Sequence, residues 1–142
     1  METPKRKRIL LIEGTELPSN TVIELVKAGY VLEWNLLDET TPGRIKQQYS
    51  LYDVIVIGGS VEREKQHELL RAISIVEGDA VRLLVPVVCV DLRVPRIIRL
   101  QDLVLVPDQF DAIADGVKRA LADLAGVMRR MMERTAAREA KT

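Results

Sequence analysis

Polar and glycine residues follow three apolar runs of this sequence, at the points where buried strands are expected to end. They are Glu13-Gly14, Gly58-Gly59-Ser60 and Asp91-Leu92-Arg93, and a fourth apolar run ends in Val106-Pro107. The carboxyl ends of parallel strands are where open α/β sheets bind ligands and carry out chemistry. We therefore interpret these four groups as the candidate site.

Glu13 and Asp91 are the two carboxylates of this set. If their strands flank a common neighbour, two strand spacings place their backbones roughly 9–10 Å apart. Gly58 would leave space between them for a cation, because hard cations prefer oxygen ligands. The alternative is a pair of solvated carboxylates at loop edges. We favour that alternative and expect no metal and no cofactor.

Gly58-Gly59-Ser60 precedes a helical pattern, and helix N-termini approached through glycine bind anions. Arg93 or Arg96 could close over such an anion and complete a nucleotide or phospho-ligand pocket. No complete phosphate-binding glycine motif is present. Ser60 as an ordinary helix N-cap explains the same residues, so both interpretations stay open.

Cys89 and His67 are a further pair with the chemistry of a nucleophile and a base. Cys89 lies within an apolar run rather than on a sharp turn, and His67 lies among charged residues of a helical pattern. A buried structural cysteine and an exposed histidine fit these surroundings better. We expect no catalytic residue and no enzymatic activity.

Apolar runs alternate with helical patterns along the chain, which is typical of an α/β fold. Strands are expected over residues 9–12, 30–36, 53–57, 86–91 and 103–106. Helices are expected over residues 20–28, 41–49 and 62–76, with a long C-terminal helix from about 108 past 128.

Five strands alternating with helices predict a doubly wound, flavodoxin-like parallel sheet of order 2-1-3-4-5, covered on both faces. Only fifteen residues separate Asp91 from Pro107, and Pro95 is one of them. This interval predicts a shortened fourth helix. The expected organisation is a basic arm over 1–8, one domain over 9–126 and a helical extension over 127–142.

The composition is typical of a soluble globular domain, with 47% hydrophobic and 30% charged residues in a chain of 142. A single cysteine excludes an internal disulfide. No apolar run is long enough to span a membrane, and no signal-peptide pattern follows the basic N-terminus. We expect a cytoplasmic protein with no membrane partner.

The two ends of the chain are basic and the body is acidic. Residues 1–8 and 127–142 each carry a net charge of +3, so residues 9–126 carry −6, because the total is zero. Nucleic-acid binding favours one broad basic face. Solvated, frayed ends explain the pattern better, and a nucleic-acid partner is not expected.

Apolar residues of the C-terminal helix recur at nearly heptad spacing: Phe110, Ile113, Val117, Leu121, Leu124, Met128 and Met131. The part beyond Ala125 is expected to extend past the domain. Met128, Met131 and Met132 are then predicted to form an interaction surface, because methionine-rich surfaces adapt to partners. The partner would be a second copy or another protein, and the alternative is a frayed tail.

Four segments resemble, in their order and spacing, the receiver domain of bacterial two-component response regulators over about residues 7–126. They are the strand Arg8–Gly14, the step Ala28–Val31, the strand Tyr52–Ile57, and Leu105-Val106-Pro107 followed by Phe110.

The resemblance also shows where this chain departs from the family. A receiver is phosphorylated on an aspartate after its third strand, where this chain has Gly58. It holds magnesium with two acids after its first strand, and here these positions are Glu13 and Gly14. The hydroxyl residue that ends strand four is Asp91, and the lysine before the proline is Val106.

Phosphoryl transfer to a carboxylate needs a nucleophile, a hard cation and a positive charge on the transferred group. Glycine and valine supply none of these. We predict a degenerate pseudo-receiver of two-component signal transduction that acts through protein–protein contacts. The alternative is a regulatory domain that binds a small ligand or nucleotide through Ser60, Arg93 and Arg96.

Overall fold

The structure is a computed structural model that describes residues 6–15, 19–100, 102–109 and 111–122. Its strands are β1 (Arg8–Glu13), β2 (Val31–Leu36), β3 (Val54–Ile57), β4 (Ser74–Glu77), β5 (Ala80–Leu83), β6 (Val87–Val90), β7 (Ile98–Arg99) and β8 (Leu103–Val106). Its helices are α1 (Ser19–Lys27), α2 (Thr41–Gln48), the short 3-10 helix η1 (Tyr49–Leu51), α3 (Arg63–Ala72) and α4 (Ala112–Ala122).

The predicted α/β class is confirmed, and the central sheet is mostly parallel rather than wholly parallel as expected. The sheet has the order β2-β1-β3-β6-β8-β7, in which the first five strands are parallel and β7 is antiparallel to β8. The expected five-strand sheet is therefore wrong at one edge. The chain turns back there because Leu100 N–H donates to the Leu103 carbonyl at 2.8 Å, which joins β7 to β8.

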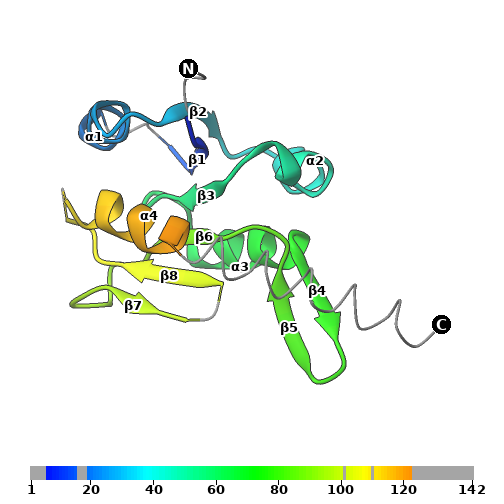
Figure 1. Cartoon of the computed structure of the whole chain (residues 1–142). Coiled ribbons are helices and arrows are strands. Elements are labelled where there is room, and N and C mark those ends of the chain that lie inside the picture. The colour runs from blue at the N-terminus through cyan, green and yellow to red at the C-terminus, as the bar shows by residue number, and fades with distance from the viewer. Residues whose placement is uncertain (1–5, 16–18, 101, 110, 123–142) are drawn as a thin grey trace, which may run out of the picture.

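Helices cover both faces of the sheet (Figure 1). On one face α1 and α4 pack through Leu25, Ile113 and Val117. On the other face α2 and α3 pack through Ile45 and Leu69. Strand β3 is buried along its whole length because helices lie on both sides of it.

The predicted helix over 62–76 is too long. Helix α3 ends at Ala72, and the antiparallel hairpin β4–β5 follows, with Gly78 at a φ of +60° in its turn. Ile75 and Val76 are β-branched and precede Gly78-Asp79, a combination that favours a hairpin over a further helical turn. Periodicity alone does not distinguish the two for such a short apolar run.

The predicted fourth helix is also wrong. None of the residues described between Asp91 and Asp102 is helical, and this interval holds turns and β7 instead. Pro95 and the few residues available explain the loss of a helix. The β6–β8 crossover therefore places no helix on the sheet.

Helix α4 begins at Ala112, later than expected, and is described as far as Ala122. The predicted continuation of this helix, and with it Met128, Met131 and Met132, lies outside the described residues. So does most of the basic N-terminal arm, although Arg8 belongs to β1. In the described part of the chain, no helix has the length and apolarity needed to cross a membrane.

Candidate functional site

Glu13, Gly14, Gly58 and Ser60 form a compact group at the carboxyl ends of β1 and β3, which we call the strand-end cluster. Glu13 is only 2% exposed. Its carboxylate accepts a hydrogen bond from the Ser60 hydroxyl and another, at 3.2 Å, from the Ser60 backbone N–H. Gly14 N–H donates to Ser60 Oγ at 2.7 Å. These bonds hold the loop that follows β1 against the loop that follows β3.

Both glycines of the strand-end cluster are needed for this close approach. A Cβ atom at Gly58 would overlap the Glu13 carboxylate, and one at Gly14 would overlap the Ser60 carbonyl oxygen. The Glu13 side chain thus occupies the volume that an aspartate at position 58 would need. This is the position at which the receiver resemblance places the phosphoacceptor.

Burial raises the pKa of Glu13, and the nearby charge of Asp108 raises it further. The hydrogen bonds from Ser60 act in the opposite direction and are outweighed. Asp108 directly follows Val106-Pro107, one of the four strand ends predicted to form the site. The predicted site did not include the acidic side chain of Asp108. Val106 itself is fully buried in the core beneath α4, so it does not reach this cluster.

Asp91 is directed toward Arg93 rather than toward Glu13. Its Oδ1 accepts the Arg93 N–H at 3.0 Å and lies 3.4 Å from Arg93 Nε, and the backbone hydrogen bond from Arg93 is the main cause of its lowered pKa. Among the described residues, no group of three or more acids, cysteines or histidines is placed to hold a metal ion. The favoured alternative of two solvated carboxylates is nevertheless wrong for Glu13, which is buried.

Neither interpretation of Ser60 holds in the structure. Its hydroxyl bonds Glu13 and Gly14, so it is not presented to an anion. It is not the helix N-cap either, because that position belongs to Glu62, whose side chain makes no capping bond. The predicted group of Ser60, Arg93 and Arg96 is therefore not assembled around one anion site.

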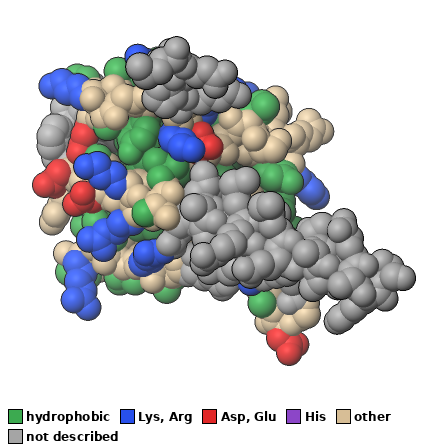
Figure 2. Space-filling model, in the orientation of Figure 1, with side chains coloured by type: hydrophobic (Ala, Val, Ile, Leu, Met, Phe, Trp, Pro, Cys, Tyr) green, Lys and Arg blue, Asp and Glu red, His purple; other side chains and the backbone are tan. Residues whose placement is uncertain are grey.

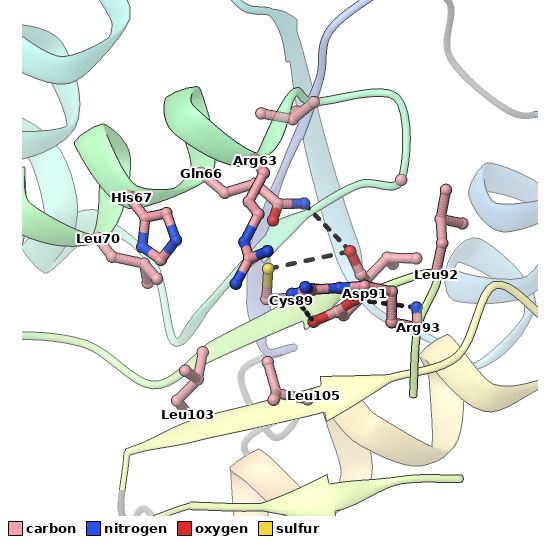
Figure 3. A pocket seen from close by; sticks show the side chains of 13 residues that line it. Arg63, Gln66, His67, Leu70, Cys89, Asp91, Leu92, Arg93, Leu103 and Leu105 are labelled. Atoms are coloured by element: carbon pink, nitrogen blue, oxygen red, sulfur yellow. Dashed lines mark hydrogen bonds and ion pairs between the residues drawn. The ribbon is translucent and has the colours of Figure 1, made fainter. Parts of the chain in front are cut away.

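Arg93 instead lies at a pocket of about 520 Å³ between α3 and the strands β6 and β8, which we call the α3–β8 pocket. In Figure 3, α3 side chains border it on one side and β8 side chains on the other. Its lining comprises Gly59, Val61, Arg63, Gln66, His67, Leu70, Cys89, Val90, Asp91, Leu92, Arg93, Leu103 and Leu105. Arg96 is not among them, whereas Arg63, which the sequence did not single out, is.

Cys89 and His67 both line this pocket, but they do not form a nucleophile and base. Cys89 is buried, and burial together with the Asp91 charge raises the pKa of its thiol to about 12. It therefore stays protonated at neutral pH. The buried position of Cys89 and the exposed position of His67 confirm the sequence-based expectation for both side chains.

A scan against models of protein families, a search of curated proteins and a search of solved structures each found no match to this chain.

Proposed function

We propose that this chain is a receiver-like signalling domain that takes no phosphoryl group and acts through contacts with another protein. One observation carries the proposal. The Glu13 carboxylate occupies the space above Gly58, where a receiver would present its phosphoacceptor. The group that fills this space is held by Ser60 and comes from within the same chain.

The electrostatics of the strand-end cluster support the same conclusion. A transferred phosphoryl group needs cations around it, and Glu13 and Asp108 bring negative charge to this position instead. The receiver lysine position is Val106, which lies in the core. An incoming phosphoryl group would meet repulsion and find no nucleophile.

The β4–β5 hairpin supports the interaction role. It projects from the sheet (Figure 1), and a hydrophobic side chain is visible beside its acidic tip (Figure 2). Val76 and Val81 pair across its strands and are 74% and 65% exposed. Exposed apolar pairs on a projecting element are suited to a protein contact. The sequence offers Met128, Met131 and Met132 as a second surface, and a homodimer through either is part of the proposal.

Incubation with acetyl phosphate and magnesium tests the absence of phosphotransfer. We expect the intact mass of the full chain to stay unchanged. A receiver domain with an intact phosphoacceptor, treated in parallel, should gain the mass of one phosphoryl group. An acid-stable or acid-labile phosphoryl adduct on this chain would contradict the proposal.

Sedimentation velocity tests the contact surfaces in the full chain. We expect self-association that is weakened either by Val76→Lys with Val81→Lys or by Met128→Gln, Met131→Gln and Met132→Gln. The variant that weakens it identifies the surface. A wild-type chain that stays monomeric at all concentrations would overturn the homodimer and leave a different protein as the partner.

A further inference from the structure

The α3–β8 pocket exists because one crossover lacks its helix. Helices α1, α2 and α3 lie in the connections that lead to β2, β3 and β6, whereas the described residues of the connection from β6 to β8 form only turns and β7. Two neighbouring strands span roughly 10 Å, about the diameter of one helix. The α3 side of β6 and β8 is therefore left without cover over a helix-sized area.

The floor of this pocket is apolar. Leu103 and Leu105 of β8 are only partly buried and pack beside Leu70 of α3 and Cys89 of β6. Gln66 fixes the border of the floor, because its Nε2 donates to the Val90 carbonyl at 3.1 Å. The volume of about 520 Å³ falls within the roughly 300–1,000 Å³ of small-molecule pockets.

The rim of the pocket is positively charged. Arg63 begins α3 and Arg93 follows β6, and in Figure 3 both extend toward the space beside Cys89. Among the described residues of the lining, Asp91 is the only acid, so two arginines face one carboxylate. Arg93 contacts Asp91 through two guanidinium nitrogens, Nε at 3.4 Å from Oδ1 and Nη2 at 3.5 Å from Oδ2. A guanidinium has five N–H donors, so others remain for a ligand. The positive end of the α3 dipole lies at the same rim.

We infer that the α3–β8 pocket binds a small amphipathic anion, with an apolar body on Leu103 and Leu105 and a carboxylate or sulfonate between Arg63 and Arg93. A nucleotide fits less well, because none of the described residues that line the pocket is a tryptophan, tyrosine or phenylalanine that could stack a base. The 127–142 segment of this chain is disfavoured as the occupant of the pocket, because it is basic and the same two arginines would repel it. The inference does not depend on the proposed protein contact or on the absence of phosphotransfer.

Fluorescence titration of the full chain with 1-anilinonaphthalene-8-sulfonate tests this site. We expect saturable binding at one site, displaced by decanoate and not by decan-1-ol, which has the same chain length without the charge. Replacing both arginines, as Arg63→Gln with Arg93→Gln, should weaken binding about tenfold or more, because charge-assisted hydrogen bonds are lost. Arg71→Gln on the same helix, outside the lining, is the matched control and should bind as wild type.

Amide chemical shifts of isotope-labelled full chain locate the bound decanoate. We expect changes at residues 89–93 and 103–105 that disappear in the double arginine variant. Displacement by decan-1-ol equal to that by decanoate would overturn the anion preference. Unchanged affinity in the double variant, or shift changes only outside the pocket, would overturn the site. Competition by an acidic peptide but not by decanoate would overturn the small-molecule class.

Discussion

The strand-end cluster and the α3–β8 pocket belong to one sheet and differ in how they are filled. The cluster lies at the carboxyl ends of β1 and β3, whereas the pocket lies on the α3 side of β6 and β8 and reaches the carboxyl end of β6 at Asp91 and Arg93. In the cluster, Glu13 enters the space over Gly58 and is held by Ser60, so the carboxyl ends of β1 and β3 are closed. In the pocket, the missing crossover helix leaves Leu103 and Leu105 open beside α3. The cluster is thus closed by a side chain, and the pocket is open because no helix covers that part of the sheet.

The two regions also differ in charge. The closed cluster concentrates acid, from Glu13 and Asp108, whereas the open pocket presents Arg63 and Arg93. An anion is repelled by the first region and attracted by the second. Position in the fold alone therefore does not determine where an α/β domain binds its ligand. The side chains around each candidate site decide whether that site stays accessible.

The largest effect is expected from Gly58→Asp, which introduces an acid where the receiver resemblance places the phosphoacceptor. The new side chain and the Glu13 carboxylate would compete for one buried volume, and two buried like charges would result. We expect a loss of about 3 kcal/mol or more in the free energy of unfolding, measured with urea.

Gly43→Asp is the matched control for that substitution, because Gly43 lies in the first turn of α2 with nothing within 4 Å. Its stability should stay within about 1 kcal/mol of the wild type. Equal stability of the two variants would show that the strand-end cluster opens easily. It would contradict the contrast between a closed cluster and an open pocket.

A smaller loss is expected from Gly14→Ala, whose methyl group would overlap the Ser60 carbonyl oxygen. The loop must shift and strain its hydrogen bond to Ser60, at a cost of about 2 kcal/mol in the free energy of unfolding. Gly43→Ala, with open space around it inside a helix, should be neutral or stabilising by up to about 1 kcal/mol. Calorimetry of both variants provides the comparison.

Ser60→Ala removes the hydroxyl that joins Glu13 to Gly14. We expect a loss of about 1–2 kcal/mol in the free energy of unfolding at pH 7, because the buried Glu13 carboxylate loses a hydrogen-bond donor. Decanoate binding should not change, since Ser60 does not line the α3–β8 pocket. Weakened decanoate binding in this variant would show that the two regions are one site.

The smallest effect concerns the pH dependence of stability. The pKa of Glu13 is raised in the folded state, so its ionisation disfavours folding and the wild type loses stability as the pH rises above the ordinary value of 4.5. Glu13→Gln has no such ionisation. The stability of this variant relative to the wild type should increase from pH 4 to pH 7. A difference that is constant with pH would contradict burial of an ionisable carboxyl.

The sequence by itself predicted the mostly parallel α/β sheet, because continuous, largely β-branched apolar runs such as Val54–Ile57 alternate with helical patterns along the chain. The residue types alone also establish that Gly58 and Val106 carry neither a nucleophile nor a charge, whatever the fold. The buried Cys89 followed from its apolar neighbours in the same way.

Only the tertiary structure decided what fills the strand ends. Glu13 and Ser60 are 47 residues apart, and their contact depends on how β1 and β3 pair. Short runs such as Ile73–Val76 fit a helix or a strand equally well by periodicity, so packing decides between them. The α3–β8 pocket depends on a helix that the β6–β8 crossover does not form. These features are long-range and arise from packing, which local sequence patterns do not encode.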